Sequence, residues 1–421
     1  MSTTVKFNST DVSKVASKVS ALGATTIRVD IFATQKNEKG ECFVAFAGTD
    51  GQAQITERIV GATKSTENTS VYFGKEILTF AVKLASISDD LELVLNKASA
   101  SLKAGSANIE VAYKTEDTVS PFIVPKQDEV IGRFGVKMND FKKALAQGTY
   151  AAQAGTERSF TEAISFVPVK ADDSAIIKIE SCGMGNGCIG ASELLAFETM
   201  NGSTCLNTFS ISCKRVGIIS HLEGDALSVV VTPTMAVFST QSENVILPLF
   251  NRIDPKATEV TLPNIDKMYF NELPVKVSAN VNKSKLLAAL NTVQCVADAD
   301  TTSTTKSKAV LCTTEKGKLV LESANAKCHI EVECDSVDGT MDRFGFNPKF
   351  AISALQASTE DVVKFSAIET VNRAGNKQTI VFIRYGVDDV YGTFFAELKV
   401  SGVEGKKKAQ APKTESTTAE E

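Results

Sequence analysis

The sequence predicts an α+β protein of three tandem domains, each with two copies of a strand–helix–strand unit. The clearest copy spans residues 345–367, where alternating phenylalanines precede a helical apolar pattern and a second extended segment. Pro348 stands in its first helical turn, a position that tolerates proline. Similar copies begin at Phe73 and Phe209, and these anchors and Phe344 are 136 and 135 residues apart. A fixed period of this length indicates repeated domains.

A looser copy precedes each of these units. Phe7, Val136 and Ala279 each lead a polar turn and then a helix with apolar residues three and four apart. The chain therefore holds six half-domain units in three pairs. Chance recurrence is the alternative, and the repetition of both order and spacing argues against it.

Composition suits a globular chain of this organisation. The 421 residues correspond to about three domains, and 43% hydrophobic with 23% charged residues is typical of soluble proteins. Residues 1–10 lack the apolar region of a signal peptide, and no stretch approaches the ~20 apolar residues that span a bilayer. Nine cysteines without close spacing favour reduced thiols over a disulfide framework. We therefore expect a cytoplasmic protein.

The first predicted domain covers residues 1–126. Apolar residues at helical spacing predict a helix at 77–84, and β-branched and aromatic runs predict strands. The predicted strands are 27–33, 42–47, 53–60, 91–96 and 106–113. Residues 115–128, with two prolines and no periodicity, are expected to form a linker.

The second and third predicted domains cover residues 129–262 and 275–400. In the second, the same criteria predict helices at 140–147 and 213–222 and strands at 134–138, 163–169, 175–180, 226–232 and 235–239. The third closes with strands at 378–385 and 392–400. Residues 401–421 are small, polar and charged, which predicts a disordered tail.

A glycine run at 182–190 is the strongest enzyme-like signal. Gly185, Gly187 and Gly190 fit the dinucleotide-binding pattern, between a strand at 176–180 and a predicted helix at 191–197. The acidic residue that should end the next strand is missing, and so is the Lys-Ser or Lys-Thr pair of a phosphate loop. The favoured interpretation is a flexible glycine-rich connection.

Metal binding and catalysis have little support. Zinc sites usually use closely spaced cysteine pairs, whereas the gaps here are wider, between Cys182, Cys188, Cys205 and Cys213. His221 and His329 are the only histidines, and neither lies in a nucleophile motif. We therefore expect no enzyme activity, no metal and no cofactor.

Charge is segregated along the chain. The whole chain carries −5, but the six predicted helix windows contain eleven Lys or Arg and three Asp or Glu. The bland interpretation is solvated helix faces. The favoured one is a shared helical surface that faces a polyanion such as DNA. The cations are Lys14, Lys18, Lys75, Lys83, Lys142, Lys143, Lys214, Arg215, Lys283, Lys285 and Lys349.

Three motifs carry a resemblance to a known family. They are GFNPKFAISALQASTEDVVKFSA at 345–367, FKKALAQGTYAAQ with the following SFTEAISFV, and LPNIDKM at 262–268. With these motifs in order at domain spacing, the chain resembles the bacterial-type DNA sliding clamp, the beta subunit of DNA polymerase III. The resemblance extends over about residues 5–400.

The resemblance implies a head-to-tail homodimeric ring with helices lining the hole and sheets outside. Such a ring encircles double-stranded DNA without reading its sequence and tethers the replicative DNA polymerase as a processivity factor. The helix cations would then meet phosphates. Ring closure would pair the edge strand 106–113, with Ile109, against the region around Val293 of the other subunit.

The family's partner pocket accepts a linear peptide of the polymerase or the clamp loader. Carried over by position, its walls are Thr161, Pro263, Met268, Phe394, Ala396 and Leu398. The family's D-G-H-R-L loop is replaced here by the run at 183–190, and the chain continues past FAELKV at 395–400 into a tail. Both departures are typical of a divergent clamp with altered partner specificity, such as one encoded by a phage.

Two other interpretations stay open. A non-catalytic β-rich structural or assembly protein could use the same repeat without encircling DNA. An oxidoreductase built on the glycine run is the more distant alternative.

Overall fold

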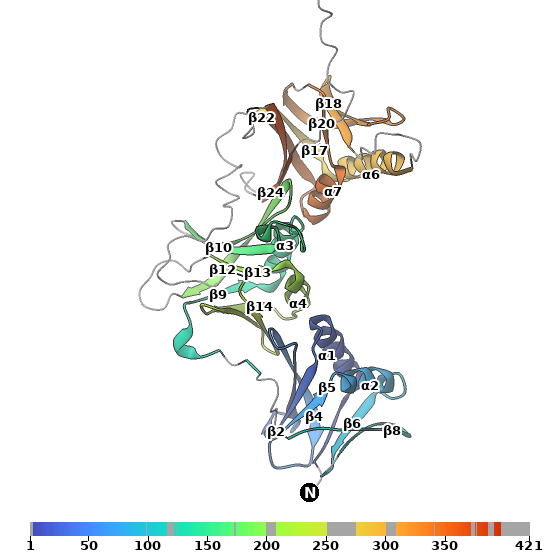
Figure 1. The fold of residues 1–421 in the computed structure, drawn as a ribbon, viewed down its shortest axis with the longest axis vertical. Helices are drawn as coiled ribbons and strands as arrows, with labels where there is room; N and C mark the ends of the chain where they lie inside the picture. The colour runs from blue at the N-terminus through green and yellow to red at the C-terminus, as the bar shows by residue number, and fades with distance from the viewer. Residues whose placement is uncertain are drawn as a thin grey trace, which may run out of the picture. The chain divides into compact units, whose positions relative to one another are not determined.

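The computed structural model divides the chain into two compact units, Met1–Met268 and Tyr269–Glu421 (Figure 1). The structure describes residues 3–97, 99–115, 122–123, 125–171, 174–198, 208–250, 275–299, 309–340, 342–371, 375, 377–385 and 391–396. The predicted tail at 401–421 and the segment 262–268 lie outside the described residues.

The first unit contains two modules, and module 1 covers residues 3–115. Its helices are α1 (Ser9–Leu22) and α2 (Glu76–Ala85). Its strands are β1 (Thr3–Asn8), β2 (Thr26–Lys36), β3 (Cys42–Thr49), β4 (Gln54–Thr63), β5 (Thr69–Gly74), β6 (Asp90–Leu95), β7 (Ala100–Ala104) and β8 (Ala107–Val111). All pair antiparallel, in the order β5-β2-β3-β4-β1-β6-β7-β8.

Local chemistry fixes the ends of α1. The Asn8 side chain accepts a 2.8 Å hydrogen bond from the Thr10 amide, which caps the first turn. Gly23 ends the helix in the left-handed region, at φ 73°, which favours glycine. Between these ends, Val12, Val15 and Val19 are buried at helical spacing.

Module 2, residues 129–250, repeats this plan. Its helices are α3 (Met138–Thr149) and α4 (Val216–Ser220), with 3₁₀ turns at Gln127–Glu129, Ser159–Glu162 and Cys213–Arg215. Its strands are β9 (Gly132–Lys137), β10 (Ala163–Ala171), β11 (Ser174–Cys182), β12 (Asn186–Glu198), β13 (Phe209–Ser212), β14 (Ala226–Val231), β15 (Met235–Ser239) and β16 (Glu243–Pro248). They pair in the order β13-β10-β11-β12-β9-β14-β15-β16. The helix predicted at 213–222 is thus a 3₁₀ turn followed by a short α4.

The second unit holds module 3, residues 275–396. Its helices are α6 (Lys283–Ala299) and α7 (Pro348–Ala357). Its strands are β17 (Val275–Asn282), β18 (Val310–Glu315), β19 (Lys318–Ser323), β20 (His329–Gly339), β21 (Phe344–Phe346), β22 (Val362–Val371), β23 (Lys377–Tyr385) and β24 (Tyr391–Ala396). They pair in the order β21-β18-β19-β20-β17-β22-β23-β24.

One strand order therefore occurs three times in the described chain. In each module, a half-unit of strand, helix and three strands is followed by a second half-unit of the same kind. Phe73 and Phe209 lie in β5 and β13, and Phe344 begins β21, so the three anchors occupy equivalent strands. This confirms the predicted α+β fold of tandem, duplicated strand–helix–strand units.

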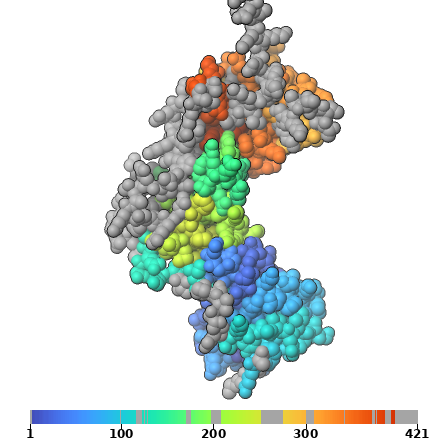
Figure 2. Space-filling model, in the orientation of Figure 1, coloured from blue at the N-terminus to red at the C-terminus, as the bar shows by residue number. Residues whose placement is uncertain are grey.

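A short seam joins modules 1 and 2. The seam consists of β4 residues 54–57 paired antiparallel with β16 residues 243–246. Ile55 and Val245 are register partners and both are buried. Figure 2 shows the blue surface of module 1 in contact with the yellow-green surface of module 2.

Candidate nucleic-acid interface

The helices gather on one side of each described unit. In the first unit α1 packs on α2 and touches α4, and Figure 1 shows these three helices on the same side. In the second unit α6 packs on α7. A cation on the outer face of these helices would point away from the sheets.

Most of the predicted helix cations are exposed on this surface. Lys214 is 62% exposed and lies 3.4 Å from Glu162. Lys283 is half-buried and donates a 3.0 Å hydrogen bond to the Ser358 carbonyl. Lys142 is also half-buried. The exposed set is Lys14, Lys75, Lys83, Lys143, Lys214, Lys285 and Lys349.

Lys18 does not belong to this surface, so its prediction as a DNA contact is wrong. Its side chain is only 8% exposed and lies over the seam. The ammonium is 3.2 Å from Glu57 Oε1, is hydrogen-bonded to Glu243 Oε1, and is 3.9 Å from Glu223 Oε2. We call these four residues the seam cluster.

Three carboxylates share the one lysine of the seam cluster. Burial lowers the pKa of Lys18, but the hydrogen bond and charge of Glu243 and the charge of Glu57 outweigh burial and raise it above its ordinary value. Burial raises the pKa of the Glu57 carboxyl, and the charges of Glu243 and Glu223 act in the same direction against Lys18. The second oxygen of Glu57 is buried and has no hydrogen-bond partner.

Arg215 also works within the first unit. Its guanidinium lies 2.6 Å from Asp50 Oδ2 and donates to the Leu22 carbonyl at the end of α1. The side chain is 20% exposed. Arg215 therefore ties module 2 to module 1 and offers less free surface to a polyanion than its neighbour Lys214.

The glycine run at 182–190 is a strand hairpin, not a flexible connection. It forms the turn between β11 and β12, and β12 occupies the segment predicted as a helix at 191–197. A Cβ at Gly190 would lie 2.1 Å from the Ala144 carbonyl oxygen of α3. Glycine is therefore needed because α3 packs closely on the strands, and the hairpin has no dinucleotide-binding geometry.

The cysteines do not form a metal site in the described residues, where no group of three or more candidate ligands occurs. Cys205 lies outside the described residues. Cys188 is buried beside the Ser181 hydroxyl, at 3.1 Å, and burial raises the pKa of its thiol to about 12. Such a thiol is unreactive at neutral pH.

The predicted partner pocket is not assembled by the described residues. Pro263, Met268 and Leu398 lie outside them, and nothing is described of the Ala396 side chain. Thr161 is fully buried, and its hydroxyl donates to carbonyls of Gln153 and Arg158. Phe394 is buried in the second unit. Thr161 and Phe394 therefore have no free surface, and the remaining pocket residues stay a prediction.

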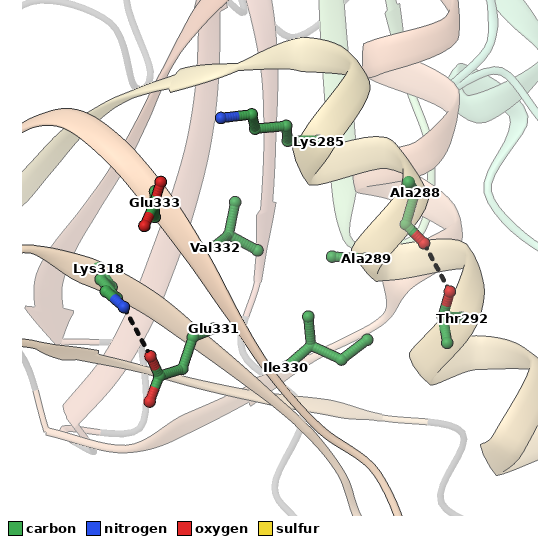
Figure 3. A pocket seen from close by; sticks show the side chains of 9 residues that line it. All are labelled: Lys285, Ala288, Ala289, Thr292, Lys318, Ile330, Glu331, Val332 and Glu333. Carbon is green, nitrogen blue, oxygen red and sulfur yellow. Dashed lines mark hydrogen bonds and ion pairs between the residues drawn. The ribbon is translucent and has the colours of Figure 1, made fainter.

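A groove of about 550 Å³ lies between α6 and the start of β20 (Figure 3). Ile330 and Val332 of β20 point toward Ala289 of the helix, with Thr292 beyond. The paired charges of Lys318 and Glu331, 2.8 Å apart, flank this apolar floor. β20 residues 329–333 pair with β19 on one side and have no described strand on the other.

Val293, predicted at a subunit interface, is fully buried in the core under α6. Its neighbour Thr292 lines the groove instead. The correction is a matter of helical phase, because Leu286, Ala289 and Leu290 place Val293 on the buried stripe. Ile109, the other predicted interface residue, is partly buried on β8, which in the described chain pairs only with β7.

None of the helices in the described ranges is long and apolar enough to cross a membrane.

Comparison with solved structures identifies the fold. The chain is similar to the C. crescentus beta sliding clamp, with a TM-score of 0.71 and 14% identity over 95% of this chain and 100% of that chain. It is similar to the Bacillus subtilis DNA polymerase sliding clamp, with a TM-score of 0.72 and 13% identity over 95% and 100%. The chain has the sliding-clamp fold.

A third clamp adds information on partners. The Helicobacter pylori beta clamp, solved with a DNA ligase peptide, matches with a TM-score of 0.72 and 12% identity over 94% of this chain and 100% of that chain. No family model and no curated protein matches the sequence. The fold has thus been kept while most residues have changed.

Sequence reasoning missed the seam cluster and the groove. Lys18 was counted among free cations because the charge count ignored helical phase. Val15, Val19 and Leu22 are buried on α1, which places residue 18 on the same stripe. Glu57 and Glu243 gave no local signal because they meet only through the pairing of distant strands.

Proposed function

We propose that the protein is a non-catalytic DNA sliding clamp, which encircles duplex DNA and tethers a replicative DNA polymerase in the cytoplasm. The observation that carries the proposal is the threefold repeat of one strand order with exposed lysines on its helices, in a chain with the sliding-clamp fold. The clamp solved with a ligase peptide supports linear peptides of the polymerase and the clamp loader as partners.

The helix lysines suit a mobile contact with DNA. They are exposed ammonium groups on flexible stems, and the exposed ones belong to five of the six helix windows. Such groups attract phosphates through counterion release and carry no information about base sequence. A ring held to DNA in this way can slide.

The seam inside the chain supplies a template for ring closure. β8 takes the place in module 1 that β16 takes in module 2, and the paired ladders put Ile109 where module 2 has Val245. β20 takes the place of β4, and Ile330 stands where module 1 has Ile55. We propose that β8 of one copy pairs with β20 of a second copy, with Ile109 opposite Ile330, which gives a homodimeric ring.

The neighbouring pairs of this register are chemically compatible. Ala107 would oppose Val332, and Asn108 would oppose Glu331. Glu110 would oppose His329, which already lies 2.9 Å from Glu322. The free edge of β8 and the groove of Figure 3 would be covered together.

A topological assay tests the function. The protein is assembled by a clamp loader on a nicked circular duplex and separated from free protein at moderate salt. We expect it to stay on the circle and to leave when one restriction cut linearises the DNA. Equal retention on linear and circular DNA would indicate ordinary binding, and no retention on either would favour the structural-protein alternative.

The peptide site needs its own test because two of its residues lie outside the described chain. Met268→Ala together with Leu398→Ala should abolish binding of a polymerase clamp-binding peptide and leave dimer assembly and Tm nearly unchanged. A large loss of Tm with unaltered peptide affinity would assign both residues to the core.

A further inference from the structure

We infer that the seam cluster is a specificity device: Lys18 lets β16 pair with β4 of its own chain and with no other free strand edge. The part of this inference that concerns other copies rests on the proposed ring. The part that concerns the seam itself does not.

The seam places two acids face to face. Glu57 and Glu243 are direct register partners on antiparallel strands, and both are buried. Like charges in this position destabilise a strand pair, more so away from water. Without a nearby cation, the four register pairs of this seam would carry two opposed, buried carboxylates.

Lys18 meets this requirement from the helix above the seam. Its ammonium contacts Glu57 of module 1 and Glu243 of module 2. Glu243 Oε2 also accepts a 2.7 Å hydrogen bond from the Glu223 amide. The only lysine or arginine found against these carboxylates within the described ranges is Lys18.

The equivalent positions of the proposed subunit seam are neutral. Asn8 and Asn282 both accept an amide hydrogen bond at the start of a helix, and the amides of Ser9 and Lys283 donate to Asp89 and Asp361. Counting from these caps, Thr292 of α6 stands where α1 has Lys18. Val332 stands where module 1 has Glu57, and Ala107 where module 2 has Glu243.

These differences make the wrong pairings unfavourable. If β16 paired with β20 of another copy, Glu243 would be buried opposite Val332 beside Thr292, with no cation. If β8 paired with β4, Lys18 would keep Glu57 but lose Glu243. A buried charge that lacks its partner is strongly unfavourable, whereas a complete neutral seam is not, so charge can select the partner without adding net stability.

Hydrogen exchange on the full-length chain tests the seam. In Lys18→Thr we expect the amides of residues 54–57 and 243–246 to exchange at least about tenfold faster, with amides in β10 and β11 unchanged. In the neutral variant Lys18→Thr/Glu57→Val/Glu243→Ala, seam exchange should return to within about threefold of wild type. The control is Lys14→Thr, an exposed lysine one turn earlier on α1, which should exchange as wild type does.

Oligomeric state tests the selection. The neutral variant should form mixed, larger oligomers at concentrations where the wild type gives one dimer, because β16 can then pair with β20 of other copies. Unchanged seam exchange in Lys18→Thr, no rescue by the neutral variant, or a homogeneous dimer of the neutral variant would each overturn the inference. A monomeric wild type would refute the proposed ring, and the exchange result would still decide the role of Lys18.

Discussion

Ile109 offers the sharpest test of the proposed ring. In the proposed seam it faces Ile330 over the groove beside α6, as Val245 faces Ile55 inside the chain. Replacing Ile109 with Lys removes an apolar side chain worth about 2 kcal/mol when buried. Desolvating the introduced ammonium opposite Ile330 adds about 2 kcal/mol more.

These values set the expected shift in dimerisation. About 4 kcal/mol corresponds to a factor of roughly 10³ for one seam. A two-subunit ring has two seams, so its dissociation constant should rise by about 10⁶, and the variant should be monomeric at micromolar concentration. Sedimentation equilibrium over a range of concentrations measures this directly.

A matched control separates the seam from general effects of charge. Asn108→Lys adds the same group one residue earlier, where the side chain is exposed and would face Glu331 across the seam. This control should remain a dimer. Dimers of both variants with equal dissociation constants would refute the assigned seam, and monomers of both would show that β8 tolerates no lysine at either position.

Three further predictions concern DNA, pH and the hairpin. Serine at four exposed helix lysines should lower DNA affinity and reduce the salt slope by about 0.9 per lost phosphate contact, measured by anisotropy. Serine at four exposed lysines outside the helices should change neither. Because the folded pKa of Glu57 is raised above its ordinary 4.5, its contribution to stability is fully present below that pH and is lost as pH rises through the folded pKa. Glu57→Gln should therefore flatten this part of the pH dependence of the free energy of unfolding, and an unaltered profile would contradict the assignment. Gly190→Ala should cost about 1–3 kcal/mol in chemical denaturation because its Cβ would meet α3, whereas Gly185→Ala, with nothing within 4 Å, should cost little. Equal costs would contradict the packing argument. The helix set is Lys14, Lys143, Lys214 and Lys285, and the control set is Lys36, Lys39, Lys64 and Lys97.

Local patterns in the sequence were sufficient to predict the repeat. The anchors at Phe73, Phe209 and Phe344 occupy equivalent strands because apolar spacing is set by the period of each element. The segment 191–197 was predicted as a helix because Ala, Glu and Leu favour helices. It is a strand because β12 pairs with β11 and β9 on its two sides, and tertiary pairing outweighs so small a preference.

The site could be predicted only in part, for a related reason. Exposure of Lys14 or Lys349 follows from composition and helical phase within one element. The burial of Lys18 depends on Glu57 and Glu243, which are 39 and 225 residues away in sequence. No local pattern reports a contact of that separation, although alignment of the repeats would have shown that Lys18 and Thr292 are equivalent.

A repeated module gives a chain several similar strand edges, and this creates a problem of choice. Edges built on one strand order can pair with each other in more than one combination, which leads to swapped or open assemblies. The seam inside the chain and the proposed subunit seam differ in just the residues that would decide between these combinations. Lys18, Glu57 and Glu243 form a complete charged set, and Thr292, Val332 and Ala107 form a neutral one. A mixed pairing would bury part of the charged set without its partners, so divergence at three equivalent positions can direct each edge to one partner.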